Sequence, residues 1–331
     1  MEKIKIGIFG MGYLGKIHTR ILQNIPGYHI IGFYDPDPHA KEDGIKAGLK
    51  KFDDSDLLIS LCDAIDVVCT TSAHYEVAKA AITAGKHVFI EKPITETPEQ
   101  AAALLKLSEE KGIKAMAGHV ERFNPAILPL KFNEINPLFI EVHRLAMFNP
   151  RGTDVSVIHD LMIHDLDIML CFVSSPIRKI HASGVAILSD TPDIANARIE
   201  FENGCVANVT ASRIAMKSMR KMRIFQKGKY ISIDFLQGKS EILQLLYQKP
   251  YNFNGAVSFT FNGKEAYITT TTLSHKDINA IELEFRAFYD SITKNKPVPV
   301  GLSDGYKALI LAKDILEHIN QRNQEVLESF H

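Results

Sequence analysis

The stretch GIFGMGYLG (residues 7–15) sets Gly10, Gly12 and Gly15 in a GxGxxG pattern directly after an apolar run. The first glycine permits a tight turn, the second lets a pyrophosphate approach the backbone, and the third lets a helix pack closely against a strand. The phosphates would then face the N-terminus of that helix. We therefore expect the turn to bind a dinucleotide through Gly10, Met11, Gly12, Tyr13, Leu14 and Gly15.

The region around this turn alternates short apolar runs with segments of helical spacing. Strands are predicted at residues 4–9, 29–34, 65–70, 87–90 and 114–116, and helices at 16–24, 75–83 and 98–111. Strands that alternate with helices favour a parallel sheet with right-handed crossovers. The turn thus lies inside a βαβ unit, which is the context that makes a GxGxxG pattern specific for dinucleotides.

Asp35 ends the second predicted strand, 20 residues beyond Gly15. A carboxylate at this place accepts hydrogen bonds from an adenosine ribose and repels a 2'-phosphate, and no arginine follows at once to hold such a phosphate. The cofactor expected is therefore NAD rather than NADP. The alternative is that the glycines only form a turn and that Asp35 only caps a loop.

Beyond about residue 120 the pattern changes, as expected for a chain of 331 residues with two domains. A strand-like run at 138–147 precedes β-branched runs joined by the hairpin signals Asn203-Gly204, Lys227-Gly228 and Asn262-Gly263. Helices are predicted at 277–293 and 304–320, the second capped by Ser303.

The sequence thus predicts an α/β protein with two domains, divided near Asn124-Pro125. Residues 1–122 would form a Rossmann domain with a parallel sheet. Residues 123–331 would form an α+β domain with a largely antiparallel, open sheet against which helices pack.

The charge balance indicates which partners to expect. The formal net charge is -1, so no overall field would attract nucleic acid or an anionic membrane. The N-terminus lacks the features of a signal peptide, and no apolar run is long enough to span a membrane. Four cysteines show no CxxC pair and lie in apolar surroundings typical of buried thiols: Cys62, Cys69, Cys171 and Cys205. A cytoplasmic protein with a small-molecule substrate is expected.

Four further segments, together with the GxGxxG turn, resemble the Gfo/Idh/MocA oxidoreductases. They are GKHVFIEKPIT (85–95), GHVERFNPA (118–126), HDLMIHDLD (159–167) and ELEFRAFYDSI (282–292). The resemblance implies a Rossmann domain followed by an α/β domain whose open sheet mediates homodimers or homotetramers. It also implies an NAD(P)-dependent dehydrogenase acting on a CH–OH group.

The resemblance also assigns individual residues. The EKP lysine of the family falls on Lys92, near the nicotinamide and the reacting hydroxyl, and its DxxxH motif falls on Asp160 and His164. Further contacts with the cofactor are implied for Thr70, His74, Glu91 and Lys92. Two departures stand out: a TPxxxH element appears as the shorter TTSAH, and Met162 replaces a common glycine.

The segment HDLMIH suggests how a proton could be moved. If the segment is helical, Asp160 and His164 lie roughly 40° apart around the axis, whereas His159 and His164 lie roughly 140° apart. A zinc helix of the HExxH kind needs its histidines four apart, so no metal is expected.

Hydride transfer from a secondary alcohol requires a base for the hydroxyl proton. We expect His164 to accept it, Asp160 to orient His164, and Lys92 to hydrogen-bond the hydroxyl oxygen or share the acid–base role. Lys92 could instead be only a turn residue before Pro93. His159 and Asp165 are interpreted as structural, and Asp167 as solvated.

The substrate class is suggested by SRIAMKSMRKMRIFQKGK (212–229), which contains seven lysines and arginines and no acidic residue. It is either a sheet edge protected by charge or a local phosphate site. GHVERFNPA resembles the nucleotide-sugar 3-dehydrogenases of the family, so Arg122 and Asn124, with Lys92 and His164, are expected to contact substrate. Arg122 and Asn124 could instead simply close a helix start.

The function expected is oxidation of a secondary hydroxyl of a sugar, with a UDP-linked amino sugar as the candidate substrate. The alternatives are a dehydrogenase for free sugars or inositol, and a catalytically silent NAD-binding regulator. Neither composition nor motif spacing separates these, because one fold hosts many functions. Retention of Lys92, Asp160 and His164 together favours catalysis.

Overall fold

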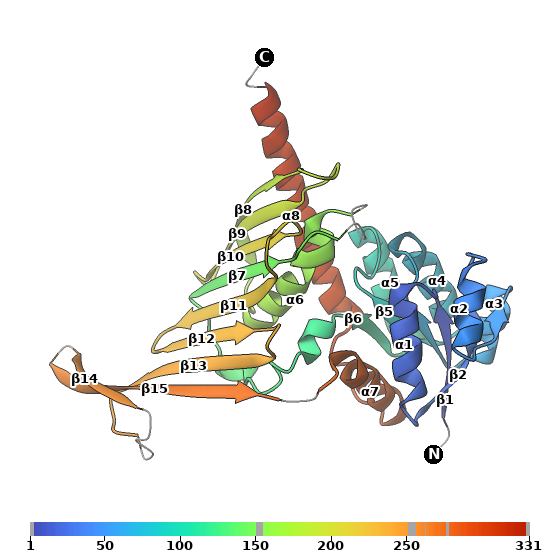
Figure 1. Cartoon of the computed structure of the whole chain (residues 1–331), viewed down its shortest axis with the longest axis horizontal. Coiled ribbons are helices and arrows are strands. Elements are labelled where there is room, and N and C mark those ends of the chain that lie inside the picture. Colours follow the sequence, from blue (N-terminus) through green and yellow to red (C-terminus); the bar gives the residue numbers. More distant parts are fainter. Residues whose placement is uncertain (1–2, 150–154, 251–255, 262, 276–277, 329–331) are drawn as a thin grey trace. The chain divides into compact units, whose positions relative to one another are not determined.

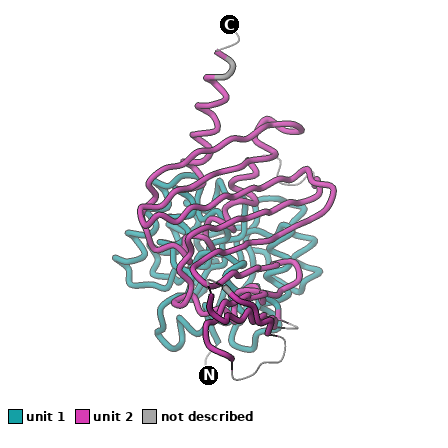
Figure 2. Tube along the Cα trace, turned by 90° about the vertical axis from the view of Figure 1, so that its left-hand side faces the viewer, with its two compact units in different colours: residues 1–123, 279–310 teal, residues 124–278, 311–331 magenta. Residues whose placement is uncertain are grey.

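The computed structural model describes residues 3–149, 155–250, 256–261, 263–275 and 278–328. The chain forms two compact units (Figure 2), one of residues 1–123 and 279–310, the other of residues 124–278 and 311–331. The predicted division into 1–122 and 123–331 differs from this one, because residues 279–310 return to the first unit. No helix among the described residues is long and apolar enough to cross a membrane.

The first unit is built on a parallel sheet of six strands (Figure 1). The order is β3-β2-β1-β4-β5-β6. The strands are β1 (Ile4–Phe9), β2 (Tyr28–Tyr34), β3 (Lys51–Phe52), β4 (Ala64–Val67), β5 (His87–Glu91) and β6 (Ala115–Gly118). The parallel sheet and five of its strands were predicted, whereas the two-residue β3 was not. The predicted strand 65–70 ends earlier, because α4 begins at Thr71.

Most helices of the first unit connect these strands, whereas η1 and α7 come after β6, the last strand of this sheet. The helices are α1 (Tyr13–Gln23), α2 (Ala40–Lys46), α3 (Ser55–Leu61), α4 (Thr71–Thr83), α5 (Pro98–Lys111), the 3₁₀ turn η1 (Val120–Phe123) and α7 (Ala280–Thr293). The bounds of α5 agree with the prediction because a capping box of Thr97 and Gln100 begins it, and Gly112 ends it in a left-handed conformation. The short helices α2 and α3 were missed, since seven residues carry too little periodicity.

The aromatic face of α7 explains why it belongs to the first unit. The ring of Phe285 packs 4.7 Å from that of Phe89 on β5, and its carbonyl accepts a hydrogen bond from the Tyr28 hydroxyl on β2. The predicted helix start at residue 277 lies outside the described residues. In the structure the side chain of Asn279 caps the helix, accepting from the amides of Ile281 and Glu282.

The second unit contains a sheet of nine strands in the order β14-β15-β13-β12-β11-β7-β10-β9-β8. The strands are β7 (Phe139–Leu145), β8 (Ile177–Val185), β9 (Ile194–Phe201), β10 (Val206–Ser212), β11 (Met219–Gln226), β12 (Lys229–Asp234), β13 (Lys239–Leu246), β14 (Val257–Phe261) and β15 (Lys264–Ser274). Every pair is antiparallel except β7 with β10. The largely antiparallel sheet is therefore confirmed.

The predicted hairpin turns lie between neighbouring strands. Gly204, Gly228 and Gly263 all have positive φ, between +71° and +85°. However, β11 and β12 lie in the interior of the sheet. The interpretation of residues 212–229 as a charge-protected sheet edge is therefore wrong, because β13, β15 and β14 extend the sheet beyond them.

Helices cover one face of this sheet. They are the 3₁₀ turn η2 (Phe132–Glu134), the π-helical turn η3 (Ile158–Met162), α6 (Ile163–Phe172) and the C-terminal part of α8 (Leu302–Glu328). Figure 1 shows α6 and α8 on the same face of the sheet. Ser303 does not cap α8, which begins at Leu302, and the Asp304 carboxylate instead accepts from the Gly301 amide at 2.9 Å.

Candidate functional site

The glycine turn between β1 and α1 has the shape that a dinucleotide needs. Gly10 has φ +106°, and a Cβ there would lie 2.6 Å from the backbone of Cys69. A Cβ on Gly15 would collide with the Gly10 carbonyl oxygen. Gly12 is different, because it is exposed and a Cβ there would meet nothing within 4 Å. The space for a pyrophosphate therefore lies over Gly12, at the N-terminus of α1.

Asp35, which follows β2, accepts a hydrogen bond from this turn. Its Oδ2 accepts from the Met11 amide at 2.7 Å, and its Oδ1 accepts from the Asp37 amide at 2.8 Å. A carboxylate offers about four acceptor positions, so two stay available for ribose hydroxyls. Of the other predicted turn residues, Met11 buries its side chain, whereas Tyr13 and Leu14 are exposed. These residues fit a dinucleotide with an unphosphorylated ribose.

Two residues predicted to contact the cofactor lie just beyond β4. Thr70 is exposed at the N-terminus of α4, and its hydroxyl accepts from Ser72. His74 is buried, with Nδ1 2.9 Å from the Pro93 carbonyl and Nε2 3.1 Å from the Cys69 carbonyl. Burial lowers the pKa of His74, although both carbonyls oppose this. His74 thus links the segment after β4 to the segment after β5, and its contact with the cofactor stays a prediction.

Lys92 follows β5 at the carboxyl edge of the same sheet. Its side chain is partly exposed, and the Lys92-Pro93 peptide bond is cis. The preceding Glu91 is buried, and its Oε2 accepts from the Lys92 amide at 3.1 Å. The Glu91 carboxylate therefore faces the protein interior, and its predicted contact with the cofactor is not tested by these bonds.

Two charged residues that the sequence analysis missed lie beneath Glu91. His18 of α1 places Nδ1 3.0 Å from Asp66 Oδ2 on β4 and Nε2 3.3 Å from Glu91 Oε1. Burial opposes the charged imidazolium, yet the charges and hydrogen bonds of Asp66 and Glu91 outweigh it and raise the pKa of His18 to about 10. Their burial could have been predicted from the sequence, since His18 shares a helix face with Gly15 and Leu22, and Asp66 interrupts an apolar strand.

The segment with the two His-Asp pairs lies in the second unit. Residues Ile158–Met162 form a π-helical turn rather than the expected α-helix, so the angles predicted between these side chains do not apply. Asp160 and His164 are both partly exposed. Of the residues interpreted as structural, His159 contacts the Ser156 hydroxyl through Nδ1 at 3.0 Å.

The two remaining aspartates of this segment are buried. Asp165 forms a bidentate ion pair with Arg144 of β7, with nitrogen–oxygen distances of 2.6 and 3.0 Å. Asp167 is only 1% exposed, so the interpretation of it as solvated is wrong. The physical reason is that α6 is buried on nearly every side, as the burial of Ile163, Leu166, Ile168 and Met169 also shows.

Arg122 and Asn124, predicted to contact substrate, have partners within their own units. Arg122 lies 3.8 Å from Asp304 in the first unit. The Asn124 amide nitrogen donates to the Phe235 carbonyl, and its oxygen accepts from the Ala126 amide, in the second unit. Asn124 thus also forms a local turn.

Three of the seven lysines and arginines of the basic segment 212–229 are paired with nearby carboxylates. Arg213 is buried 3.6 Å from Asp193, Lys221 lies 3.3 Å from Asp234, and Arg223 lies 2.8 Å from Glu141. Paired cations have less charge to offer a phosphate. The hypothesis of an anion site then depends on the other lysines and arginines of this segment, and it stays a prediction.

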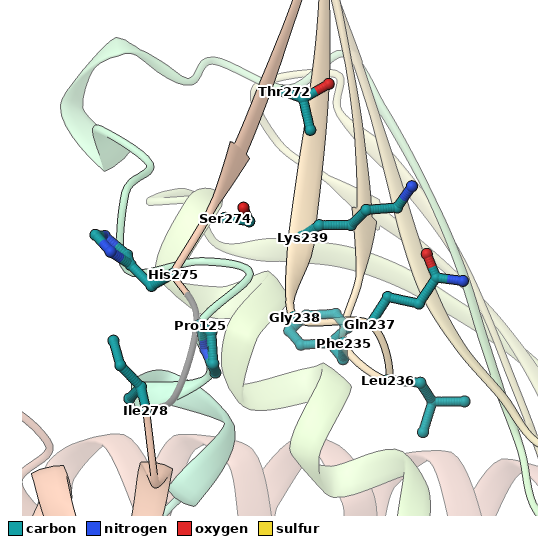
Figure 3. A pocket seen from close by; sticks show the side chains of 10 residues that line it. All are labelled: Pro125, Phe235, Leu236, Gln237, Gly238, Lys239, Thr272, Ser274, His275 and Ile278. Carbon is teal, nitrogen blue, oxygen red and sulfur yellow. The ribbon is translucent and has the colours of Figure 1, made fainter.

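A pocket of ≈ 560 Å³ lies elsewhere in the second unit (Figure 3). Its wall comes from the β12–β13 turn, the end of β15 and Pro125, with the side chains of Phe235, Lys239 and His275 around it. None of the residues predicted to act in binding or catalysis belongs to this wall. The lining of the pocket therefore includes neither the glycine turn nor the His164 segment.

Two family models match the chain. The model described as an oxidoreductase family with an NAD-binding Rossmann fold matches residues 4–119, and the model of the GFO/IDH/MocA C-terminal domain matches residues 143–230. The first match agrees with the unit that carries the glycine turn and Asp35.

Individual proteins are similar over much longer stretches. UDP-N-acetylglucosamine 3-dehydrogenase from Acidithiobacillus ferrooxidans is 37% identical over 73% of this chain and 77% of its own. A solved structure of that enzyme superimposes with a TM-score of 0.84 at 32% identity, covering 96% of this chain and 98% of the other. The NAD⁺-dependent scyllo-inositol 2-dehydrogenase of Bacillus subtilis is 26% identical over 64% of this chain and 68% of its own.

Proposed function

The chain belongs to the GFO/IDH/MocA oxidoreductase family, and we propose that it is an NAD-dependent dehydrogenase for a UDP-linked amino sugar. The candidate substrate is UDP-N-acetylglucosamine, oxidised at its 3-hydroxyl. The observation that carries this proposal is the similarity to the A. ferrooxidans 3-dehydrogenase, which extends over both units. The inositol dehydrogenases among the relatives make a cyclic polyol the alternative substrate.

The glycine turn and Asp35 would hold the cofactor. Gly12 leaves room for the pyrophosphate at the N-terminus of α1, and the carboxylate of Asp35 accepts from the adenosine ribose. When bound, NAD supplies the acceptor for the hydride that leaves the substrate carbon. The same carboxylate disfavours NADP, because a 2'-phosphate would bring a second negative charge against Asp35.

The proton chemistry is assigned to three side chains of this protein. His164 accepts the hydroxyl proton as the carbon–hydrogen bond breaks and the carbonyl forms. Asp160 orients the imidazole of His164 and stabilises its charged form. Lys92 donates a hydrogen bond to the substrate oxygen, where its positive charge favours the departure of the proton. Arg122 and Asn124 are assigned to substrate binding.

The first experiment measures NADH formation with UDP-N-acetylglucosamine, UDP-glucose, free N-acetylglucosamine and myo-inositol. We expect NADH only with the UDP-linked amino sugar. NADH with myo-inositol or free sugars alone would instead support the alternative substrate. No activity in either the oxidation of these substrates or the reverse reduction, despite measurable NAD binding, would support a catalytically silent regulator.

The assignment of the base is tested with His164→Asn. We expect kcat to fall about 10²- to 10⁴-fold, the range of general base catalysis, while the Kd of NAD stays within about two-fold. His159→Asn is the matched control, because it lies in the same segment, contacts the Ser156 hydroxyl at 3.0 Å and has no role in the proposed chemistry. Near-normal turnover in the His164 variant would contradict the assignment.

A further inference from the structure

Three ionisable side chains meet in the core of the first unit, and one of them directly precedes Lys92 in the chain. They come from three elements: His18 from α1, Asp66 from β4 and Glu91 from β5. The His18 ring stands between the two carboxylates, 3.0 Å from Asp66 and 3.3 Å from Glu91. The rings of Phe89 and Phe285 lie edge-on to His18 at 5.9 and 5.0 Å, so apolar groups surround the cluster.

Stability does not by itself account for this cluster. A buried ion pair is on average no more stabilising than apolar side chains of similar volume, because both charges lose their hydration. Removing one partner, however, leaves an uncompensated charge in the core. The imidazolium form of His18 balances one of the two carboxylates, in agreement with its raised pKa of about 10. The geometry of the cluster is therefore strongly specified.

The cluster is continuous with the backbone that carries Lys92. Glu91 uses one carboxylate oxygen for His18 and the other for the Lys92 amide. On the far side of Lys92, the carbonyl of Pro93 accepts from the buried His74 at 2.9 Å. Both neighbours of Lys92 are thus tied to buried histidines, one through a side chain and one through the backbone.

Glu91 has little freedom to move within this arrangement. It pairs with Gly118 on β6, and a Cβ added to Gly118 would lie 3.0 Å from both the Cα and the carboxyl carbon of Glu91. Close packing on one side and the His18 contact on the other hold its side chain in one orientation. The hydrogen bond from the Lys92 amide to Glu91 therefore also restricts the backbone of Lys92.

We propose that His18, anchored by Asp66, is a positioning residue that holds the Glu91 side chain and thereby fixes the backbone of residues 91–93 and the direction of the Lys92 side chain. The effect on the backbone stands on the contacts within the first unit. The consequence for turnover rests on the proposed function, in which Lys92 contacts the substrate oxygen.

The backbone effect is tested by hydrogen exchange and mass spectrometry on the full-length protein. His18→Gln loses the charge at the centre of the cluster. Glu91→Gln removes the carboxylate charge and replaces one of the two oxygens that serve His18 and the Lys92 amide with an amide nitrogen. In both we expect amides in peptides spanning residues 89–95 to exchange about ten-fold faster, with little change in peptides from β2. Tyr28→Phe is the control for residues 89–95, because it removes a buried hydrogen bond from the same core but leaves the cluster intact.

Two results would overturn the backbone effect. One is unchanged exchange at residues 89–95 in both variants. The other is equally faster exchange throughout the first unit, which would indicate general destabilisation. If His18→Gln does not fold, Glu91→Gln alone decides the outcome, since it leaves the His18–Asp66 contact in place.

The consequence for turnover is tested by separating kcat from binding. We expect His18→Gln and Glu91→Gln to lower kcat by about 10- to 100-fold at saturating substrates, the cost of a displaced catalytic group, and the Kd of NAD to stay within about two-fold in His18→Gln. Unchanged kcat despite faster exchange would overturn this part. A wild-type protein that forms no NADH from any sugar would contradict the proposed function instead, and the exchange experiment would still stand.

Discussion

Asp35 has two roles that follow from the same carboxylate. It accepts from the amides of Met11 and Asp37, so it shapes the glycine turn from the end of the neighbouring strand. The proposed contact with the adenosine ribose uses the acceptor positions that remain. A single residue thus couples the conformation of the turn to the choice of cofactor.

Asp35→Ala should therefore weaken NAD binding and reduce the preference for NAD over NADP. We expect the Kd of NAD to rise about ten-fold, equivalent to roughly 1.4 kcal/mol, because hydrogen bonds to a charged group are lost. Fluorescence titration with NADH and NADPH measures both affinities. Asp37→Ala is the control, since Asp37 accepts from the His39 amide and not from the turn. An unchanged ratio of the two affinities would refute this role of Asp35.

At the scale of elements, the connection between β8 and β9 is organised by one buried carboxylate. Asp193 accepts from the amides of Ile187, Leu188 and Ser189, and from the Ser189 hydroxyl. Burial would raise the pKa of Asp193, but these hydrogen bonds outweigh it and lower the pKa from 3.8 to about 2. The ionised form is therefore the one that the folded loop stabilises.

The stability of the protein should depend on this group at acid pH. Because the folded-state pKa is lowered, the stabilisation is present above pH 3.8 and is lost as the pH falls towards about 2. We expect Asp193→Asn to lower the free energy of unfolding by about 1–3 kcal/mol at pH 7, and the difference from wild type to shrink between those two pH values. Chemical denaturation across this range measures it.

The matched control for this prediction is Asp190→Asn, an exposed aspartate in the same connection. It should leave the free energy of unfolding unchanged at every pH. A difference between wild type and Asp193→Asn that stays constant down to pH 2 would show that the hydrogen-bonded carboxylate is not the titrating group.

At the scale of the whole molecule, the second unit leaves one face of its large sheet without a helix among the described residues (Figure 2). Cross-strand neighbours on that face include Phe139, Phe225 and Tyr230, which lie on three adjacent strands. The ring of Phe225 lies 5.9 Å from that of Phe139 and 5.0 Å from that of Tyr230. Phe225 is 40% exposed, and an ion pair between Arg223 and Glu141 lies beside it. An aromatic patch with a polar margin suits association with a second copy of the chain.

We therefore predict a homodimer or homotetramer that associates through this face. Phe225→Asp should shift the mass measured by light scattering towards the monomer, because it places a charge in the apolar centre of the patch. Ile45→Asp is the control, since Ile45 is an exposed apolar residue on α2 of the other unit. A monomeric wild type, or an unchanged mass in the Phe225 variant, would contradict the prediction.

The sequence by itself determined the parallel-sheet unit, its glycine turn and the helix α5. These features depend on local chemistry, because glycine conformation, apolar periodicity and caps act between residues close along the chain. The turn could be predicted from Gly10, Gly12 and Gly15, and the bounds of α5 from Thr97 and Gly112. The family resemblance in the EKP and DxxxH segments was likewise contained in short stretches.

Only the tertiary structure decided which distant residues meet. It returned α7 to the first unit, placed β11 inside the sheet, turned Asp167 inward, and brought His18, Asp66 and Glu91 together. Local patterns show that a residue is buried, but they do not show its neighbour. The neighbour depends on strand order and on the packing of the whole core, to which every element contributes at once.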